Sequence, residues 1–587
     1  MDPAERDKNM NKESKFCQNC KQNFVIDPED FDFYKKIDVP PPTWCPECRA
    51  RRRMMFRNER TLYKNNCKLC GKSTIAMYPA DTPYNVYCFE CWTSDKWDPL
   101  SFGQEYDFSR PFFEQFGEFL KKVPRPSVEG SQNLNCPYTN YTWESKNVYM
   151  SSSILYSDNA AYIKGGEKCI DTFDCFQITD VTMCYECVNC ERLNNSKFMV
   201  NCRDCINSSF LFDCVNCSNC FLSSNQRNQS YMLENVKYSE AEYYEKLKEY
   251  RLDEYGGVEN VKMKFSSLVK NALHKFARIT KAVNATGDNL YNAKDAKECF
   301  DLHDLQNVSY TIRGWNIKDS MDIYGTDDTQ WDYESVNNGL YSSHLIFTAN
   351  CHTNCLDIRY SDYCRSSSHL FGCISMKKGQ YCVFNKQYSE EEYKGMVAKI
   401  IDQMNAMPYT DKRGRIYKYG EFFPPEISPF AYNEVVAQEY FPVAEEKAIE
   451  EGFGWKKPDA KNYQITMSAE SIPGKIADVS DSILEQIIGC SHKGKCEHQC
   501  TTAFRLIPAE LQFYKKTGIP IPRLCINCRH CERLLKRNPV KLWHRSCMCN
   551  KQNHGHAEKC KNEFETSYAP EREELVYCEQ CYNAEVA

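Results

Sequence analysis

Paired cysteines at both ends of this 587-residue chain constrain its fold more than any other feature. Near the start, CxxC pairs begin at Cys17, Cys45, Cys67 and Cys88. A CxxC turn presents two thiolates from one tight turn of the backbone, and two such turns complete a tetrahedral zinc site. Pairs spaced at intervals of roughly 15–25 residues are typical of structural zinc. The sequence therefore predicts that metal ions organise the ends of the chain.

The two ends also resemble each other in sequence. The string FYKK at residues 33–36 returns at residues 513–516, and Cys45 corresponds to Cys525, a shift of 480 positions in each case. We therefore expect each end to fold into a small ribbon-like or treble-clef-like module that holds two zinc ions.

About four structural zinc ions are expected in all, each with four protein ligands and no open position for water. The predicted ligands are Cys17, Cys20, Cys45 and Cys48 for the first ion; Cys67, Cys70, Cys88 and Cys91 for the second; Cys496, Cys500, Cys525 and Cys528 for the third; and four of Cys547, Cys549, Cys560, Cys578 and Cys581 for the fourth. His554 and His556 are further candidates for the fourth site. Cys490 and Cys531 have no counterpart at the other end, and we expect them to be ordinary thiols.

The start of the chain indicates the compartment. The segment 1–16 is polar and charged, without the apolar core of a signal peptide, and no apolar run anywhere is long enough to cross a membrane. We therefore expect a cytoplasmic protein without a membrane span. In the reducing cytoplasm, paired cysteines are more often metal ligands than disulfides, which favours zinc over disulfides. An iron–sulfur cluster is the remaining alternative, although its cysteines usually come in tighter runs.

The middle of the chain, about residues 130–405, contains a second duplication with a shift of 150 positions. Cys205 corresponds to Cys355, and Cys214 corresponds to Cys364. Within the copies, cysteines recur at steps of eighteen or nine positions, in segments rich in Ser, Asn, Tyr, Phe and Val. Regular spacing of this kind predicts a β-solenoid, here with coils of about 18 residues.

Three interpretations are open for the cysteines of these repeats. Buried free thiols pack as small apolar side chains, so a column of them would fill the interior. Redox chemistry of reactive thiols is a second interpretation. Extra metal ligation is the third, and the residues concerned are Cys184, Cys187 and Cys190, or Cys214, Cys217 and Cys220.

The predicted fold is mostly β, with small α+β zinc modules at the two ends and two tandem Cys-rich β-solenoid copies with capping helices between them. Ser239 with Glu242 and Ser389 with Glu392 fit capping boxes, so each copy is expected to end in a helix. Further helices are expected at 107–122, about 258–283 and about 476–488. The predicted segments are a disordered tail (1–14), an N-terminal double zinc module (15–98), a helical connector (99–129), solenoid copy 1 (130–238), helices (239–285), solenoid copy 2 (286–388), a helix (389–405), an extended connector with a short helix (406–489) and a C-terminal double zinc module (490–587).

Basic residues gather just after a cysteine pair at each end. Arginine forks suit phosphate, and interleaved aromatic side chains suit unstacked bases, so these segments predict contact with nucleic acid or a ribonucleoprotein. The residues concerned are Arg49, Arg51, Arg52, Arg53, Arg57, Arg60, Arg529, Arg533, Lys536, Arg537, Lys541 and Arg545. A protein partner or plain solvation of a charged face are the alternatives. The net charge of −6 gives the whole chain no general attraction to nucleic acid.

The sequence contains no recognisable catalytic motif, such as a Walker loop, a GxSxG elbow or a dinucleotide fingerprint. The first functional hypothesis is a non-enzymatic zinc-binding protein that contacts nucleic acid or a ribonucleoprotein through its arginine-rich segments. The first alternative is a structural or protein-interaction scaffold, in which the solenoid binds a protein partner or associates with itself. The second alternative is a thiol redox or metal-handling protein.

Several longer strings resemble a group of uncharacterised zinc-ribbon proteins predicted from environmental bacterial genomes. The strings are FYKKIDVPPPTWCPECRARRR (33–53), FNKQYSEEEY (384–393), YGEFFPPEISPFAYNE (419–434) and ETSYAPEREELVYCEQCYNAEV (565–586). The resemblance covers most of the chain and implies a cytoplasmic, zinc-stabilised bacterial protein. It implies no activity and assigns no functional residue.

Overall fold

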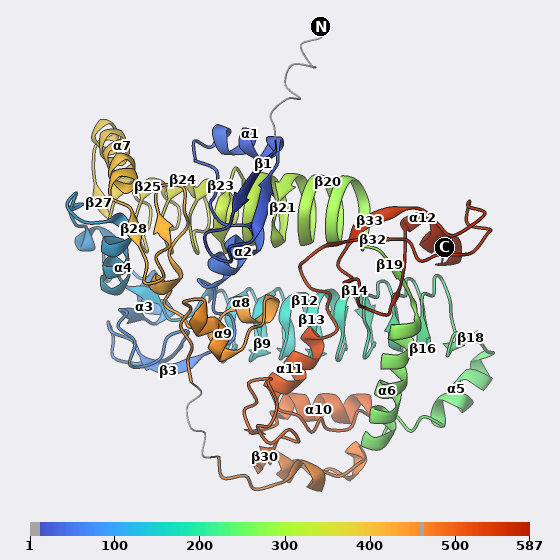
Figure 1. Ribbon diagram of the computed structural model, residues 1–587. Coiled ribbons are helices and arrows are strands. Elements are labelled where there is room, and N and C mark those ends of the chain that lie inside the picture. The colour runs from blue at the N-terminus through green and yellow to red at the C-terminus, as the bar shows by residue number, and fades with distance from the viewer. Residues whose placement is uncertain (1–11, 458–462, 587) are drawn as a thin grey trace. The chain divides into compact units, whose positions relative to one another are not determined.

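A computed structural model describes residues 12–457 and 463–586 (Figure 1). The chain divides into two compact units. Unit 1 combines Met1–Val128 with Ala277–Lys457, and unit 2 combines Glu129–Phe276 with Pro458–Ala587. Each unit therefore joins one cysteine-rich end to the middle copy that does not adjoin it in the sequence. The two units contain the same kinds of segment, because each holds one cysteine-rich end and one repeat copy.

Both units are rich in strands. The cysteine-rich end of unit 1 contains β1 (Glu13–Phe16), β2 (Asn23–Ile26), α1 (Pro28–Lys36), α2 (Pro46–Met54), β3 (Tyr63–Asn66), β4 (Ser73–Ala76), β5 (Val86–Tyr87), α3 (Phe89–Thr93), α4 (Phe112–Lys122) and β6 (Arg125–Pro126). The rest of unit 1 contains β20 (Ile279–Ser309), β21 (Ile312–Gln330), β22 (Tyr333–Val336), β23 (Gly339–Ile346), β24 (Leu356–Arg359), β25 (Ser368–Phe371), β26 (Gln380–Val383), β27 (Lys386–Gln387), α7 (Glu390–Ala406), β28 (Tyr409–Thr410), β29 (Ile416–Tyr417), α8 (Val436–Tyr440) and α9 (Glu445–Glu450).

Unit 2 has the corresponding parts in the opposite order. Its repeat copy contains β7 (Gly130–Ser131), β8 (Asn140–Trp143), β9 (Lys146–Tyr149), β10 (Ser152–Leu155), β11 (Asp158–Ala161), β12 (Lys164–Phe173), β13 (Phe176–Thr182), β14 (Val188–Asn194), β15 (Ser209–Phe212), β16 (Phe221–Ser224), β17 (Met232–Leu233), β18 (Val236–Lys237), α5 (Glu240–Lys248), α6 (Tyr255–Asn271) and β19 (Leu273–Lys275). Its cysteine-rich end contains β30 (Ile488–Gly489), β31 (Ala503–Phe504), α10 (Pro508–Thr517), α11 (Ile526–Leu534), β32 (Trp543–Ser546), β33 (Glu563–Thr566), β34 (Leu575–Tyr577) and α12 (Glu579–Val586).

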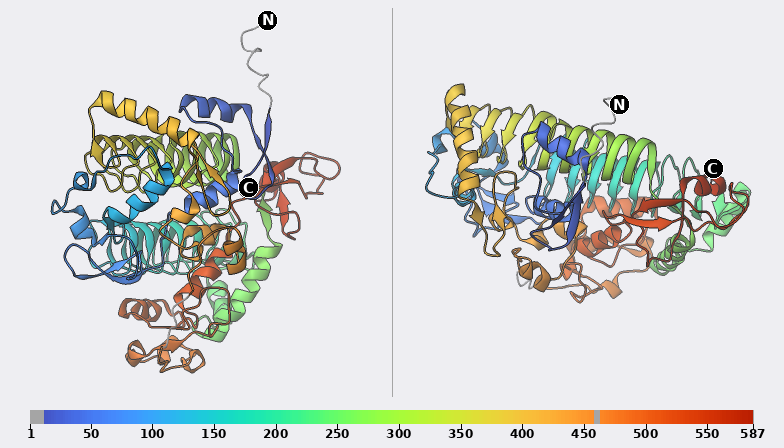
Figure 2. Two further views of the ribbon diagram at one scale, coloured as in Figure 1. Left: turned by 60° about the vertical axis from the view of Figure 1, so that its left-hand side comes forward. Right: turned by 45° about the horizontal axis from the view of Figure 1, so that its top comes forward.

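The repeat copy of each unit is a coiled parallel ladder, visible as a row of turns in Figures 1 and 2. Successive strands pair at an offset of twelve positions, as Phe176 with Val188 and Leu356 with Ser368 show. The longer coil predicted from the cysteine steps is therefore wrong. The backbone enters the left-handed region at every third residue, for example at Asn189 with φ 53°. Asn and Asp tolerate this conformation better than other non-glycine residues, which accounts for their abundance at these corners.

The interior of the ladder explains why the cysteine steps were misleading. In unit 2, the residues that fill the interior recur at every third position. They include Cys169, Cys175, Ile178, Val181, Cys184, Cys187, Cys190, Leu193, Met199, Cys202 and Cys205. Steps of nine and eighteen positions are both multiples of three, so such steps connect interior positions on different sides of the coil. The spacing of the cysteines therefore indicates which residues point inward, but it does not give the number of residues in a turn.

The interior of so short a coil holds small and medium-sized side chains, and cysteine and serine serve there in the same way. The backbone N–H of Cys202 donates to Sγ of Cys190 at 3.4 Å, and the Cys202 thiol donates to the carbonyl of Val200 at 3.3 Å. The N–H of Cys169 likewise donates to Oγ of Ser157 at 3.0 Å. These contacts support the interpretation of the repeat cysteines as buried, packed thiols.

Two single-residue insertions interrupt the regular ladder of unit 1. At residues 340–341 and again at 353–354, two successive residues have positive φ, and nearby pairs such as Tyr333 with Ile346 are offset by thirteen positions. Tyr185 corresponds to Tyr333 with a shift of 148 positions. The two insertions convert this shift into the shift of 150 positions that is found further along the chain.

The helices that follow each ladder begin as the capping boxes predict. Ser239 accepts from the N–H of Glu242 at the start of α5, and Ser389 caps α7 in the same way. Figure 2 shows α7 beside the end of the ladder in unit 1, where it packs against β26. The helix predicted near 476–488 is wrong, because extended backbone at Ser480 leaves only two short 3₁₀ turns.

Two further predicted helices and the start of the chain can be compared with the described residues. Helix α4 (Phe112–Lys122) confirms the helix expected before Pro124, whereas α6 ends at Asn271 and not near 283. Most of the predicted disordered tail lies outside the described residues, and the residues from Glu13 onward form β1. None of the helices in residues 12–457 and 463–586 combines the length and apolar character that a membrane crossing requires.

One interior position of unit 1 carries a carboxyl group. Asp332 accepts hydrogen bonds from the backbone N–H of Leu345 at 2.9 Å and from the Thr329 hydroxyl at 2.8 Å. Burial nevertheless raises the pKa of the Asp332 carboxyl to about 7. The folded chain therefore retains a proton at pH values where the unfolded chain has lost it.

We predict that Asp332 makes unit 1 less stable as the pH rises. Below about pH 4 the carboxyl is protonated in both the folded and the unfolded chain, so its raised pKa does not lower the free energy of unfolding. Above that pH the loss of free energy grows until the pH passes about 7. Substitution Asp332→Asn should therefore reduce the fall in the free energy of unfolding between pH 5 and pH 7.5, measured by urea denaturation. The exposed corner substitution Asp304→Asn serves as the control, and an unchanged pH slope in Asp332→Asn would contradict this assignment.

Candidate metal centres

The first cysteine group confirms the predicted arrangement. Cys17 directly follows strand β1 of the β1–β2 hairpin, and Cys45 is the residue that caps helix α2. Sγ of Cys20 lies 3.8 Å from Sγ of Cys45, and one ligand atom from each of Cys17, Cys20, Cys45 and Cys48 lies within 4.8 Å of the others. A tetrahedron with zinc–sulfur bonds of about 2.3 Å has edges of about 3.8 Å, so the thiols already have the geometry of a zinc site.

The second group, Cys67, Cys70, Cys88 and Cys91, is built in the same way from the β3–β4 hairpin and the start of α3. Sγ of Cys70 lies 3.9 Å from Sγ of Cys88. Burial acts to raise the pKa of the Cys67 thiol. Hydrogen bonds from the backbone of Cys70 and Cys88 to this thiol outweigh the effect of burial and lower the pKa to about 7. A thiolate, which is the form that binds metal, is therefore accessible at neutral pH.

The third group differs from the prediction in one ligand. Cys490, Cys500, Cys525 and Cys528 come together, with Sγ of Cys490 at 3.9 Å from Sγ of Cys528. Cys490 is thus not an ordinary thiol, and Cys496 is not part of this group. The reason is that Cys490 directly follows β30, as Cys17 follows β1. The signal missed in the sequence is an insertion that widens a CxxC pair into a pair separated by nine residues.

The fourth group resolves the competition among five cysteines. Cys547, Cys560, Cys578 and Cys581 lie together, and Sγ of Cys560 is 3.9 Å from Sγ of Cys578. Cys549 instead faces Nδ1 of His554 at 3.1 Å. All four groups offer four thiolates each, a donor set that suits a tetrahedral structural metal ion and zinc in particular.

The arginine-rich segment of unit 1 does not form the phosphate-binding surface that was predicted. Arg49, Arg52 and Arg53 are each at most 1% exposed. Their helix, α2, packs against the ladder, where Arg49 and Arg53 both pair with Asp322 and where Arg52 and Arg53 both pair with Glu334, at 2.8–3.2 Å. The three neighbours are also paired: Arg51 with Glu451, Arg57 with Glu59 and Arg60 with Glu439.

Unit 2 repeats this arrangement with its own residues. Arg533 of α11 pairs with Asp174 at 2.8 Å and with Glu186 at 2.9 Å, and Arg529 also pairs with Asp174. Burial raises the pKa of the Asp174 carboxyl to about 6, although both arginines oppose this shift. The other predicted basic residues of this end also contact side chains or backbone of the same chain. Lys536 pairs with Glu186, Arg537 packs on Phe176, Lys541 lies over Trp543, and Arg545 donates to the carbonyl of Ala569.

We call each of these two arrangements a clamp: α2 arginines with Asp322 and Glu334 in unit 1, and α11 arginines with Asp174 and Glu186 in unit 2. The two acids of each clamp are twelve positions apart, so they stack on successive turns of the ladder. The helix that contributes the arginines begins at a cysteine of the metal group. The clamp therefore joins each metal group to a ladder.

No family model matches the chain, and no curated protein matches it. Among solved structures, similarity is found to a protein from Desulfovibrio desulfuricans G20 described as a "putative acetyltransferase". The match has 11% sequence identity, covers 50% of this chain and 77% of that chain, and has a TM-score of 0.11. A TM-score this low means that the two backbones do not superpose, so the match supports no statement about fold or activity.

We predict that breaking a clamp destabilises its unit far more than removing a surface charge. Substitution Arg53→Ala leaves Glu334 and Asp322 buried with less compensation, which costs about 3–5 kcal/mol of unfolding free energy. The partly exposed pair of Arg60 with Glu439 should contribute less than about 1 kcal/mol when Arg60→Ala removes it. Chemical denaturation of both variants measures the difference, and equal losses would contradict a buried clamp.

Proposed function

We propose that the chain is a non-enzymatic, zinc-organised scaffold, built on two β-solenoids, that binds a positively charged protein segment in a groove of unit 1. Three observations support this proposal. The cysteine groups are closed four-thiolate sets, which stabilise folds and leave no position for a reacting water. The buried arginines of the two basic segments, such as Arg52, Arg53 and Arg533, are held in internal ion pairs. An open, acidic cavity remains on the ladder of unit 1, and this cavity is the single observation that carries the binding proposal.

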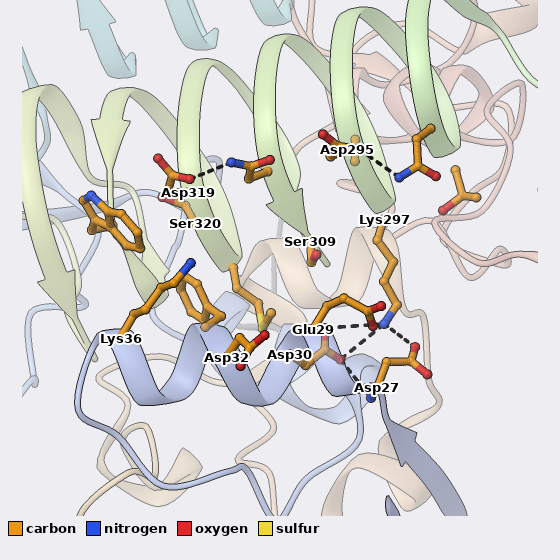
Figure 3. Close-up of a pocket in the computed structure, with 17 residues that line it drawn as sticks. Asp27, Glu29, Asp30, Asp32, Lys36, Asp295, Lys297, Ser309, Asp319 and Ser320 are labelled. Atoms are coloured by element: carbon orange, nitrogen blue, oxygen red, sulfur yellow. Dashed lines mark hydrogen bonds and ion pairs between the residues drawn. The ribbon is translucent and has the colours of Figure 1, made fainter. Parts of the chain in front are cut away.

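The groove has a volume of about 560 Å³ and lies between helix α1 and strands β20 and β21 (Figure 3). Its wall on the α1 side includes Glu29 and Asp32, both exposed. Its floor on the ladder side includes Asp295, Asp319 and Trp331. Carboxylates beside an indole ring suit a lysine or arginine side chain, which forms ion pairs with the acids and a cation–π contact with the ring.

Internal contacts neutralise only part of this acidic lining. Lys297 pairs with Asp27 at 2.5 Å and with Asp30 at 3.2 Å, as Figure 3 shows. Lys36 lies 5.9 Å from the centre of the Trp331 ring, so this ring already has one cationic neighbour. Glu29 and Asp32 remain directed to solvent at the rim of the groove, which makes them the charges most available to a partner.

The equivalent position in unit 2 lacks this character. With the shift of 480 positions, Glu29 corresponds to Ala509 and Asp32 corresponds to Gln512. There, Phe513 of α10 packs on Phe173 of the ladder with ring centres 4.6 Å apart. The acidic groove is therefore a property of unit 1 and not a by-product of the shared architecture.

The structure gives less support to the alternative functions. Five of the twelve basic residues predicted to contact nucleic acid are buried in the clamps, and an acidic groove would repel phosphate. Thiol redox chemistry needs accessible, reactive thiolates, whereas interior thiols such as Cys202 and Cys373 are buried, and burial raises the pKa of these two. We therefore favour a cationic protein segment as the partner.

We predict that a fluorescent oligolysine peptide binds the full chain with an affinity that falls as salt is added. The double substitution Glu29→Gln with Asp32→Asn should weaken binding about tenfold, because each lost ion pair contributes up to about 1 kcal/mol. Fluorescence anisotropy measures both effects. The matched control removes two exposed acids of helix α7, Glu391→Gln with Asp402→Asn, and should leave the affinity unchanged.

Two outcomes would contradict the proposed function. One is a parent protein without salt-sensitive affinity for the peptide. The other is equal weakening by the groove and α7 variants, which would indicate a diffuse charge effect. Tight binding of duplex DNA or RNA that survives the groove substitutions would return the nucleic-acid hypothesis to first place.

A further inference from the structure

We propose that the C-terminal cysteine-rich end holds two dinuclear metal centres, in each of which two divalent ions share one cysteine thiolate. The full chain would then bind six ions, two in the N-terminal end and four in the C-terminal end. This proposal adds ligands from outside the four cysteine groups to one cysteine shared with each of the last two groups, and it does not depend on the proposed function.

The first additional site lies beside the third cysteine group. Ligand atoms of His492, Cys496, His498 and Cys528 all lie within 4.8 Å of one another. Sγ of Cys496 is 3.6 Å from Sγ of Cys528, a distance that suits two sulfur ligands of one tetrahedral ion. Cys528 also belongs to the group of Cys490. A thiolate at this position can therefore donate to one ion on each side.

The two histidines of this site provide an independent observation. Nδ1 of His492 and Nδ1 of His498 are both buried and have no hydrogen-bond partner among the described residues. Buried polar atoms without a partner are rare and costly in native proteins. The rings lie with their centres 5.4 Å apart, next to the thiols. A metal ion in this position would satisfy both the ring nitrogens and the Cys496 thiolate.

The other half of the C-terminal end repeats the pattern beside the fourth cysteine group. Cys549 lies 3.1 Å from Nδ1 of His554, and Nε2 of His556 lies 3.4 Å from Sγ of Cys581. Cys581 also contacts Cys549 and belongs to the four-cysteine group, so it occupies the sharing position. The carboxylate of Glu585 lies 2.8 Å from Nε2 of His554, an orientation partner typical of metal-binding histidines.

The N-terminal end supplies an internal comparison. Two residues separate Cys17 from Cys20, and neither is a histidine or cysteine. The corresponding segments of the C-terminal end are longer, CSHKGKCEHQC at 490–500 and CMCNKQNHGHAEKC at 547–560. Each inserts one cysteine and two histidines. The insertions therefore add the same three ligands at both places, and the fourth ligand in each case is the last cysteine of the following pair.

Charge also favours a second ion at each centre. Four thiolates around one divalent ion carry a net charge of −2. Five thiolates and two neutral histidines around two divalent ions carry −1, so the second ion reduces the uncompensated charge in a partly buried site. A mixed nitrogen and sulfur donor set of this kind suits zinc, with cobalt or cadmium as spectroscopic substitutes.

Metal analysis of the purified full chain tests the proposal. The parent should contain six zinc ions per chain. The double substitution His492→Ala with His498→Ala should remove one ion, and so should His554→Ala with His556→Ala. The control is His544→Ala, an exposed histidine of β32, which should leave six. Four ions in the parent, or a count unchanged by both histidine pairs, would overturn the proposal.

A second measurement keeps the test decisive if a variant folds poorly. After exchange of the parent protein into ¹¹³Cd, nuclear magnetic resonance should show two classes of signal, one for four-sulfur sites and one for sites with nitrogen ligands. Spin coupling between the classes should appear, because a shared thiolate connects the two ions. Signals of the four-sulfur class alone would overturn the proposal.

Discussion

The buried clamp between arginines and stacked carboxylates is the interaction on which the rest of this structure depends. In unit 1, Arg52 and Arg53 meet Glu334 where helix α2 lies on the ladder. The same helix begins at Cys45, and Cys48 is in its first turn. A metal ion bound by these cysteines would hold the start of the helix, and the helix in turn holds the arginines against the ladder. Helix α2 thus connects metal binding to the packing of the ladder.

The ladder imposes the complementary constraint. With twelve positions in a turn and every third residue pointing inward, the interior holds small and medium-sized side chains. Cysteine and serine satisfy this requirement because each fills little space and can bond to the backbone of a neighbouring turn. Two stacked acids on the outside of successive turns then form a fixed target for two arginines on one helix. The short turn therefore explains both the abundance of cysteine and the geometry of the clamp.

The sequence predicted the parts of the structure that depend on local spacing. The groups beginning at Cys17 and Cys67 were correct, because a CxxC turn is a local feature. Cys490 was missed, since its pairing with Cys500 is interrupted by an insertion. The turn length was wrong because Cys184 and Cys202 occupy different sides of the coil. Spacing in multiples of three cannot distinguish one turn from one and a half.

Features that depend on distant partners could not be read from the sequence. Arg49 pairs with Asp322, which lies 273 positions further along the chain, and nothing near Arg49 identifies that carboxylate. A run of arginines has the same appearance whether it faces solvent or a buried acid. For the same reason, the membership of the N-terminal end and the second repeat copy in one unit was visible only in the structure.

Hydrogen–deuterium exchange of the full chain tests most directly whether the metal group of one end supports the ladder of its own unit. The comparison is between the parent and the double variant Cys45→Ser with Cys48→Ser, which loses two ligands of the first group. The clamp predicts faster exchange in residues 310–346 of the second repeat copy and no change in residues 162–198 of the first. Unchanged exchange in residues 310–346, or an equal increase in both segments, would contradict the account.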